Sequence, residues 1–517
     1  MKIVTAAQMR EMDRRTIAAG VAGSTLMERA GAHVADAVEA CAGSLPGARI
    51  TVVCGKGNNG GDGFVAARLL RKKRARVTAV LLAKPAELTG DAKGMYRRWI
   101  SAAGRGDTLV SPTDERLRTL LDHSHVVVDA LLGTGLSSDV TGPYRAAIEA
   151  INGAERPVVA VDLPSGLNAD TGEPMGVAVR ATVTVTFGHP KVGLYVGQGI
   201  DCAGAVRVGD IGIPREYSDD VKSLLTLLTE ETVNRLLPRR PLTAHKGTFG
   251  HTAIIAGSVG KTGAAALAAQ AALRIGSGLV TVATPSGVNA ILESKLLEAM
   301  TIPMPETKAH TLARSGLERI LAFVGARTAA AVGPGLSTHP ETVELIHALI
   351  PRLNTPAVLD ADALNALAGK TSLLGECKAP LVLTPHPGEM ARLVEEATPA
   401  TINADRLGVS TRFAAGRGVV VVLKGARTVI AQPDGQLSIC PTGNPGMATG
   451  GTGDVLTGMI AGLMAQRLPA WAAARAGVFL HGLAGDLAAA SIGRTGLLAG
   501  DVIRHIPAAI TQVASLS

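Results

Sequence analysis

The first part of the chain alternates short apolar runs with helical patterns. Residues 5–40 are rich in alanine at helical spacing, and the apolar run Arg49–Val53 leads through a glycine-rich turn into a helix from about Gly63. Apolar runs that are separated by helical patterns indicate parallel strands covered on both faces. Four more strands are predicted in this part: Arg76–Leu82, His125–Asp129, Pro157–Val161 and Thr182–Phe187.

A change of composition interrupts this series near residues 214–243. Pro214 closes one segment, and the stretch Pro238-Arg239-Arg240-Pro241 is stiff and basic. These features predict a linker that contains a connecting helix. A second series follows it, with strands predicted at Thr252–Ala256, Leu279–Ala283, Ala329–Val332, Ala357–Asp360, Leu381–Leu383 and Val419–Leu423, and helices predicted at residues 262–275, 388–396, 452–465 and 470–488.

The composition supports an α/β protein with more than one domain. A length of 517 residues is too great for one core, because domains usually span roughly 100–200 residues. The 61 glycines suit the many strand-to-helix turns of such a fold. Aromatic residues make up only 2% of the chain, so Ala, Val, Leu and Ile must build the core.

The net charge is +8, from 51 basic and 43 acidic residues. The basic residues are scattered, and no basic stretch is interleaved with aromatic residues, so little favours stacking on nucleic-acid bases. We therefore expect no nucleic-acid partner. Anionic small molecules such as phosphates explain the basic balance equally well.

The five cysteines are widely separated and form no C-x-x-C pair, which indicates reduced thiols. The N-terminal residues lack the apolar core of a signal peptide, and no apolar run reaches the roughly 18 residues of a spanning helix. We expect a cytoplasmic protein with no membrane partner, and a homo-oligomer.

A glycine-rich loop follows the first predicted strand. Gly55, Gly57 and Gly60 satisfy G-x-G-x-x-G between a strand and a helix, where free N–H groups attract phosphate. A nicotinamide dehydrogenase would also carry an acidic residue at the end of the next strand, to hold the ribose. That strand instead ends Leu82-Ala83-Lys84, which argues against an ordinary dehydrogenase.

Polar side chains stand at several predicted strand ends. Asn58, Asn59 and Asp62 lie on the glycine loop, Asp129 closes one strand, and Asp162 follows another. Asn and Asp also favour plain turns, which is the alternative explanation. In an open parallel sheet, however, the carboxyl ends of the strands line the ligand crevice. The pattern therefore favours a binding site at this edge of the sheet.

Four segments together resemble the epimerase domain of NAD(P)H-hydrate repair enzymes, over about residues 1–215. They are Gly55–Gly63 (GKGNNGGDG), Asp129–Leu136 (DALLGTGL), Val161–Leu167 (VDLPSGL) and Phe187–Leu194 (FGHPKVGL). The resemblance implies a Rossmann-like three-layer domain that binds a monovalent cation, usually potassium (K+). It also implies interconversion of the R and S forms of hydrated NADH or NADPH (NADHX and NADPHX).

The same resemblance assigns roles to individual residues. Asn59, Asp129 and Ser165 match the positions that hold potassium, and Asp162 matches the residue at the reacting ring, where we expect acid–base catalysis. Lys191 is a second catalytic candidate, although a loop lysine is more often a solvated charge. The matching substrate-binding positions are Asn58, Gly60, Gly61, Asp62, Gly133, Thr134, Gly135, Leu136, Ser137, Ser138 and Asp139.

The strongest signal in the second series is the run Asn444–Gly458. Its Gly-Thr-Gly-Asp step opens a helical pattern, and the free amides of a helix start form an anion hole. Asp454 stands beside that hole, where it can take a proton from a hydroxyl group that attacks a phosphoryl group. An Asp that only caps the helix is the alternative explanation.

This arrangement resembles the ribokinase-like fold, and further segments narrow the match to the dehydratase of the same repair system, over residues 224–512. They are His245–Gly250 (HKGTFG), Gly333–Leu336 (GPGL), Leu359–Asn365 (LDADALN), Thr384–Met390 (TPHPGEM) and Leu423–Thr428 (LKGART). The resemblance implies dehydration of the S-hydrate of NADH or NADPH, with ADP as phosphate donor. Of Asp360 and Asp362, which alternate at a predicted strand end, we expect only one to face the site.

The dehydratase resemblance also implies site residues. Ala264, Gly335, His386 and Asp454 match positions that contact the hydrate, and Glu389 takes the place of an acid that helps to hold magnesium (Mg2+). His386 has an alternative role as a hydrogen-bonded turn residue. The matching nucleotide-binding positions are Lys424, Gly425, Ala426, Arg427, Thr428 and Gly453.

These assignments lead to one mechanism and one alternative. Asp454 removes the proton of the ring hydroxyl while the β-phosphoryl group of ADP transfers to its oxygen, and the ring nitrogen then expels phosphate and restores the cofactor. The alternative is a ribokinase-like small-molecule kinase for a vitamin hydroxyl, fused to a non-catalytic dinucleotide-binding module.

Overall fold

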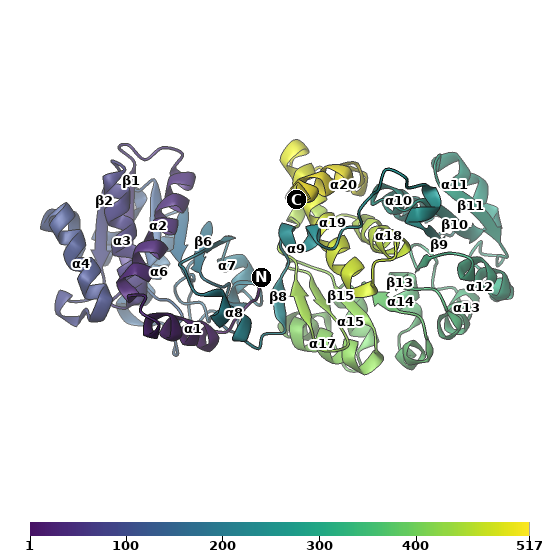
Figure 1. Cartoon of the computed structure of the whole chain (residues 1–517), viewed down its shortest axis with the longest axis horizontal. Coiled ribbons are helices and arrows are strands. Elements are labelled where there is room, and N and C mark those ends of the chain that lie inside the picture. Colours follow the sequence, from purple (N-terminus) through teal and green to yellow (C-terminus); the bar gives the residue numbers. More distant parts are fainter. Residues whose placement is uncertain (516–517) are drawn as a thin grey trace. The chain divides into compact units, whose positions relative to one another are not determined.

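The computed structural model describes residues 1–515 and divides into two compact units. The first unit spans Lys2–Ser223, and the second begins at Leu224 and also includes Met1. Each unit has its own sheet, so each is described separately (Figure 1).

The first unit is built on seven parallel strands in the order β3-β2-β1-β4-β5-β6-β7. Each of the strands predicted in this part of the chain forms. The strands are β1 (Arg49–Cys54), β2 (Arg76–Leu81), β3 (Thr108–Val110), β4 (Val126–Ala130), β5 (Val158–Val161), β6 (Val183–Phe187) and β7 (Ala205–Gly209).

Helices cover both faces of this sheet because successive strand residues point to opposite sides. Val52 and Val128 pack with α2, α3 and α4, whereas Val53 and Val127 pack with α5 and α6. The helices are α1 (Ala6–Ala18), α2 (Gly23–Ala42), α3 (Asn58–Lys72), α4 (Gly90–Ala103), α5 (Asp114–Asp122), α6 (Gly142–Gly153), α7 (Gly199–Cys202) and α8 (Arg215–Asp220).

The second unit is built on ten strands in the order β11-β10-β9-β12-β13-β14-β15-β16-β17-β8. Only the β15–β16 and β16–β17 pairs are antiparallel. The strands are β8 (Leu225–Leu227), β9 (His251–Ile255), β10 (Leu279–Pro285), β11 (Met300–Met304), β12 (Ala329–Val332), β13 (Ala357–Leu359), β14 (Leu381–Leu383), β15 (Val420–Leu423), β16 (Val429–Ala431) and β17 (Leu437–Ile439).

Two helical layers again enclose the sheet. Ile254 and Val358 pack with α10, α18, α19 and α20, and Ile255 and Leu359 pack with the helices of the other face, including α12 and α13. The helices are α9 (Glu230–Asn234), α10 (Thr262–Arg274), α11 (Asn289–Lys295), α12 (Leu317–Gly325), α13 (Pro340–Leu349), α14 (Asp362–Ala366), α15 (Pro387–Leu393), α16 (Pro399–Ala404), α17 (Arg406–Arg417), α18 (Thr452–Ala465), α19 (Ala470–Ile492) and α20 (Ala499–Ala514).

Several details differ from the sequence-based expectations. Strands β3, β7, β11, β16 and β17 form where the sequence predicted none. Residues 5–40 form two helices, α1 and α2, because Gly20 takes a left-handed backbone and interrupts the pattern. Helix α3 begins at Asn58 rather than near Gly63, so its first turn lies within the glycine loop. The predicted linker contains a strand, β8, besides two short helices.

Strand β8 belongs to the sheet of the second unit. It pairs in parallel with β17, from Leu225 opposite Leu437 to Leu227 opposite Ile439, and Leu228 just after it is fully buried. An isolated strand of this length carries little hydrophobic pattern, and its place depends on a partner 212 residues later. The polar and proline-rich flanks explain why the sequence indicates only a linker.

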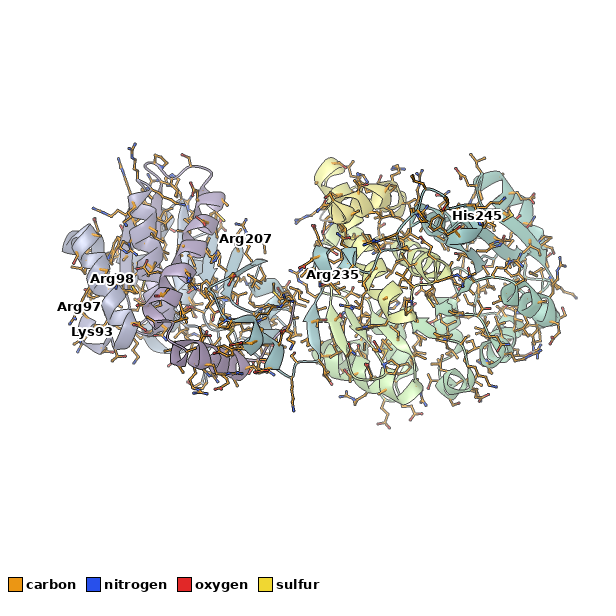
Figure 2. All side chains as sticks on the ribbon, in the orientation of Figure 1. Lys93, Arg97, Arg98, Arg207, Arg235 and His245 are labelled. Atoms are coloured by element: carbon orange, nitrogen blue, oxygen red, sulfur yellow. The ribbon has the colours of Figure 1, made fainter. Side chains whose placement is uncertain are left out.

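The surface and the helices show two further properties. Exposed basic side chains come from separate elements, as Arg98 on α4, Arg207 on β7 and Arg235 after α9 show in Figure 2. Within residues 1–515, no helix has both the length and the apolar content that crossing a bilayer requires.

The buried end of β8 allows a test of its contribution to stability. Leu228→Ala should lower the free energy of unfolding of the second unit by about 2–5 kcal/mol, because it leaves a cavity in the core. Leu224→Ala is the matched control, since Leu224 is 60% exposed and should change little. Urea titration measures both variants. Equal stability of the two variants would contradict the role of β8 as part of this core.

Candidate functional sites

A cavity of about 670 Å³ opens at the carboxyl edge of the first sheet. It lies where the loops after β1, β4, β5 and β6 meet, as parallel strands require. Most of the predicted epimerase residues line it, namely Asn58, Asn59, Asp62, Gly133, Thr134, Gly135, Leu136, Ser137, Ser138, Asp162 and Lys191. Gly60, Gly61 and Asp139, which the resemblance also implied, are not among the lining residues.

Gly60 has a packing role in the glycine loop. A Cβ atom at this position would lie 2.0 Å from the carbonyl oxygen of Gly55, so only glycine lets the start of α3 approach the end of β1 so closely. Gly61 is buried against Met27 and Ala92 in the same way. These two glycines therefore place Asn58, Asn59 and Asp62 at the cavity.

Asp162 and Lys191 form a buried ion pair at the cavity wall. The ammonium group of Lys191 donates to Oδ1 of Asp162 at 2.6 Å and also to the Thr186 hydroxyl group, and its side chain is 1% exposed. Asp162 has φ +64°, a left-handed backbone that non-glycine residues rarely adopt. The view of Lys191 as a solvated loop charge is therefore wrong.

Two more carboxyl groups lie near this pair. Burial, together with the charges of Asp162 and Asp13, raises the pKa of Asp62 well above its usual value. Burial also raises the pKa of Asp13 to about 6, although the Lys191 ammonium opposes the increase. Asp13 lies on α1 and was missed by the sequence analysis, because one aspartate in an amphipathic helix carries no motif.

Asp129, Ser165 and Asn59 meet at the carboxyl end of β4. Asp129 is fully buried and accepts hydrogen bonds from the hydroxyl and the backbone N–H of Ser165, at 2.5 and 2.8 Å. Asn59 donates to the carbonyl oxygen of Leu132, and the hydroxyl oxygen of Ser165 lies 3.2 Å from the same carbonyl oxygen. Burial raises the pKa of Asp129 to about 6 despite these hydrogen bonds. Carboxylate, hydroxyl, amide and carbonyl oxygens thus gather with no basic side chain bonded to Asp129.

In the second unit, the N-terminus of α18 presents free amides. Gly451 precedes the helix with φ +95°, and a Cβ atom there would lie 2.6 Å from Leu267. No side chain caps this helix end, so the first N–H groups, at Thr452 and Gly453, remain available to an anion. The Gly-Thr-Gly-Asp motif therefore opens a helix, as the sequence predicted.

Asp454 stands in the first turn of α18. Burial raises its pKa to about 7, the Asp360 carboxylate adds to this increase, and the Lys424 ammonium opposes it. A carboxyl group with a pKa near neutrality is suited to accept a proton. The alternative role, an aspartate that caps the helix, finds no support in the hydrogen bonds, because no side chain caps this end.

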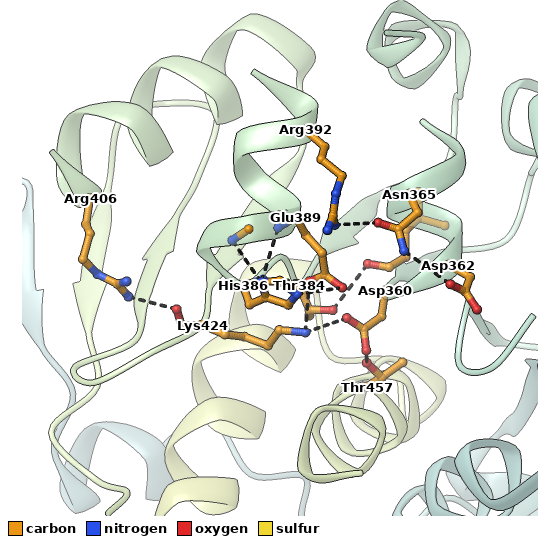
Figure 3. Close-up of polar contacts among 12 residues, drawn as sticks. Asp360, Asp362, Asn365, Thr384, His386, Glu389, Arg392, Arg406, Lys424 and Thr457 are labelled. Carbon is orange, nitrogen blue, oxygen red and sulfur yellow. Dashed lines mark hydrogen bonds and ion pairs between the residues drawn. The ribbon is translucent and has the colours of Figure 1, made fainter. Parts of the chain in front are cut away.

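Lys424 connects two acidic residues, Asp360 and Glu389 (Figure 3). Its ammonium group lies 2.8 Å from Oδ1 of Asp360 and 3.6 Å from Oε2 of Glu389. Asp360 also accepts a hydrogen bond from Thr457, one turn along α18 from Asp454, at 2.7 Å. Burial alone would lower the pKa of Lys424, but the Asp360 and Glu389 carboxylates outweigh it and raise this pKa.

Asp362 makes contacts different from those of Asp360, the other acid at this strand end. Strand β13 ends at Leu359, and Ala361 has φ +49°, so the alternation of side chains does not continue through Asp362. Asp362 pairs with Lys261 at 3.1 Å, and its charge also contributes to the raised pKa of Asp454. Asp360 contacts Lys424 and Thr457, whereas Asp362 acts on Asp454 through its charge and has the smaller effect.

His386 caps helix α15. Its Nδ1 accepts hydrogen bonds from the backbone N–H groups of Gly388 and Glu389. The backbone N–H of His386 donates to Oε2 of Glu389 at 2.8 Å. His386 is therefore a hydrogen-bonded turn residue, and of its two ring nitrogens this role uses Nδ1. In the neutral ring Nε2 then carries the proton. Nε2 lies 3.6 Å from Oε1 of Glu389, and the side chain is 51% exposed, so a ligand can still reach Nε2.

The remaining predicted dehydratase residues come from three loops. A Cβ atom on Gly335, which has φ +64°, would lie 3.3 Å from Cβ of Ala264, so these two positions are adjacent. Residues 424–428 form the hairpin loop between β15 and β16, and the Lys424 ammonium lies 3.5 Å from where a Cβ atom of Gly453 would be. Arg406 supports this loop by donating to the carbonyl oxygens of Leu423 and Lys424.

These features define a class of protein before any comparison. Both units are three-layer α/β folds with polar side chains at the carboxyl edge of the sheet. The second adds a helix start with free amides beside a carboxyl group of raised pKa. The chain is thus an α/β enzyme with two separate sites, of which the second suits a phosphate-bearing ligand.

The comparisons with known proteins agree with this class. The family model described as "YjeF-related protein N-terminus" matches residues 23–193, and the one described as "NAD(P)H-hydrate dehydratase" matches residues 252–508. The bifunctional NAD(P)H-hydrate repair enzyme Nnr of Moorella thermoacetica is 47% identical over 510 residues, which cover 98% of this chain and 96% of that protein. The enzyme of the same name from Escherichia coli is 37% identical over 491 residues, with coverage of 94% and 90%.

A solved structure resembles the second unit. It is the ADP/ATP-dependent NAD(P)H-hydrate dehydratase from Bacillus subtilis, co-crystallised with ATP and Mg2+. It is 33% identical, covers 56% of this chain and 98% of its own, and has a TM-score of 0.50. The predicted ribokinase-like fold is confirmed by this match. The chain belongs to the family of bifunctional NAD(P)H-hydrate repair enzymes.

The contacts of Lys424 predict its effect on stability. Lys424→Met should destabilise the second unit by about 3–5 kcal/mol, because the buried carboxylates of Asp360 and Glu389 lose their cation. Lys370→Met is the matched control, since Lys370 is an exposed lysine of the same unit. Thermal unfolding of both variants measures the difference. An unchanged Tm for Lys424→Met would contradict the role of this lysine as the counter-charge.

Proposed function

We propose that the first unit interconverts the R and S forms of NADHX and NADPHX, and that the second dehydrates the S form. ADP is the phosphate donor and becomes AMP. The observation that carries the proposal is the carboxyl group of Asp454, with a pKa raised to about 7, beside the free amides of α18. Membership of the repair-enzyme family supports both activities.

The dehydration follows from the groups around Asp454. The ring hydroxyl is a poor leaving group until it is phosphorylated. Asp454 takes the proton of the ring hydroxyl group while the hydroxyl oxygen attacks the β-phosphoryl group of ADP. The amides of Thr452 and Gly453 stabilise the developing charge. The ring nitrogen then expels phosphate, and loss of a proton from the neighbouring carbon restores the double bond.

The remaining residues bind the two reactants. Residues 424–428 would hold the nucleotide, with the ammonium group of Lys424 near its phosphates, and Nε2 of His386 would donate to the hydrate. Ala264 and Gly335, which lie next to each other, leave room for the ring because neither carries a large side chain. These roles rest on the family resemblance and on the positions described above.

Glu389 fits a magnesium ion that arrives with the nucleotide. Its Oε2 accepts the backbone N–H of His386 and lies near Lys424, whereas Oε1 has only Nε2 of His386 nearby, at 3.6 Å, and would be the ligand. Magnesium is commonly held by one or two carboxylates together with phosphate oxygens, and it neutralises charge on the transferred phosphoryl group. The solved relative was crystallised with ATP and Mg2+, which supports this proposal.

The oxygens around Asp129 fit potassium. A fully buried carboxylate with no basic partner is costly, and its raised pKa reports that cost. Asp129, Ser165, Asn59 and the carbonyl group of Leu132 would hold the cation. When bound, it would supply positive charge at the cavity edge. The chain's own contribution to epimerisation comes from Asp162, held in place by Lys191.

Asp454 should act as the base of dehydration. Asp454→Asn should lower kcat for the return of dihydronicotinamide absorbance by about 10²–10⁴-fold with either ADP or ATP. In the wild-type chain the rate should rise with pH through about 7, because the deprotonated form is the base.

Two outcomes decide this prediction. Normal dehydration by Asp454→Asn refutes the base role. A stable phosphorylated product in place of free phosphate identifies a small-molecule kinase and refutes the dehydratase. Asp434→Asn is the control, because Asp434 lies on the β16–β17 turn, away from this site.

Potassium should stabilise the first unit. Because the pKa of Asp129 rises from 3.8 to about 6 on folding, the cation-free protein loses stability as pH increases through this range. Replacing N-methylglucamine by potassium above pH 6 should therefore raise Tm, by about 2–4 °C per kcal/mol of binding energy. The gain should disappear in Asp129→Asn and persist in Asp122→Asn, an exposed control. A Tm independent of potassium would count against the site.

A further inference from the structure

Helix α1 forms one wall of the cavity in the first unit. Met9, Arg10, Asp13 and Ile17 of this helix are among the lining residues. The segment lies before residue 23, where the match to the family model begins, and none of its residues belongs to the motifs of the sequence analysis. Asp13 is the only carboxylate that α1 contributes to the cavity wall.

The carboxyl group of Asp13 lacks hydrogen bonds that its neighbours have. Its Oδ1 is buried and has no hydrogen-bond partner among the described residues. Asp162, by contrast, accepts from Lys191 and Thr186, and Asp129 accepts from Ser165. A buried oxygen without a partner is unfavourable in a stable core, but it is expected where a ligand or a transferred proton completes the contacts.

The charges around Asp13 come from several elements. Asp162 after β5, Asp62 on α3 and Lys191 after β6 all interact with it electrostatically. Arg10, one turn earlier on α1, donates to the carbonyl oxygen of Thr134 at 3.1 Å. Asp91 on α4 is a further acid in the cavity wall. The pKa of Asp13 is raised to about 6 in these surroundings, near the pH at which proton transfer is efficient.

Epimerisation of the hydrate requires proton transfer at two faces of one carbon. The hydroxyl group must leave from one face, and water must return to the other. An acid protonates the leaving oxygen, the carbon–oxygen bond breaks, and the lone pair of the ring nitrogen forms a carbon–nitrogen double bond. Water then adds to the same carbon, the electron pair returns to nitrogen, and a base accepts the proton of the added water. One proton thus passes from the acid to the base.

We propose that Asp13 is the second acid–base group of the epimerase site, opposite in role to Asp162. In one direction Asp13 gives its proton to the leaving hydroxyl group and Asp162 accepts a proton from water, and in the other direction the roles are exchanged. The ammonium group of Lys191 bonds to Asp162, whereas Oδ1 of Asp13 has no partner among the described residues, which favours Asp13 as the group that carries the proton before the substrate binds. This inference rests on the epimerase activity proposed above.

The test uses the full chain with chirally resolved hydrate. Asp13→Asn should lower kcat for epimerisation by on the order of 10²-fold and change KM little, because the amide keeps the shape of the side chain but transfers no proton. Glu11→Gln is the matched control, since Glu11 is an exposed acid on the same helix and should leave the rate unchanged. Dehydration of the S form by the same sample, and Tm, report on the folding of the variant.

The pH dependence separates catalysis from a structural role. The wild-type kcat/KM should fall as pH rises through about 6 in both directions, because the reaction needs one proton on the Asp13–Asp162 pair. In Asp13→Asn, kcat/KM should not fall as pH rises through about 6. If Asp13→Asn does not fold, Asp13→Glu and Asp13→Gln replace it. Only Asp13→Glu should keep epimerase activity and the fall of kcat/KM with rising pH.

The outcomes distinguish this inference from the proposed function. A wild-type chain that does not interconvert the two hydrates refutes the epimerase activity itself. A wild-type chain that does so, with Asp13→Asn equally fast or with Asp13→Glu and Asp13→Gln equally active, refutes the role of Asp13 alone.

Discussion

Removing a carboxylate from water is unfavourable unless a cation, hydrogen bonds or a proton compensates, and this constraint shapes both sites. Where the chain supplies a lysine, the acid is paired: Lys191 with Asp162, and Lys424 with Asp360. Where no lysine bonds to the acid directly, burial raises the pKa, as for Asp13, Asp129 and Asp454. Asp360 serves as an anchor, whereas Asp162, although paired, and the acids without a bonded lysine are the groups to which cation binding or proton transfer is assigned.

The parallel sheets explain why these acids meet. All seven strands of the first sheet run the same way, so the loops after β1, β4, β5 and β6 emerge at one edge. In the second sheet, the loops after β13, β14 and β15 carry Asp360, His386 and Lys424 to the start of α18. The antiparallel strands β16 and β17 follow this group and turn residues 424–428 into a hairpin loop. Sheet direction thus converts distant sequence positions into one site.

The two activities fit one chain by their chemistry. Dehydration acts on the S form, and epimerisation supplies that form from the R hydrate. The two sites use different means: the first has several carboxyl groups near one lysine, and the second has helix amides and a base. This difference follows from the reactions, because one transfers only protons and water and the other must carry the charge of a phosphoryl group.

The sequence by itself determined the α/β class, the strands of both sheets that have long apolar runs, and the motifs that gather at the sites. These features are local: a buried strand needs consecutive apolar residues, and a helix start that binds anions needs glycines at particular positions. The tertiary structure alone decided the features that depend on distant partners. Strand β8 is recognisable only beside β17, Lys191 is buried only because Asp162 lies next to it, and Asp13 reaches the cavity only because α1 packs there. Burial and electrostatic pairing depend on which segments meet in space, and that information is absent from any single stretch of sequence.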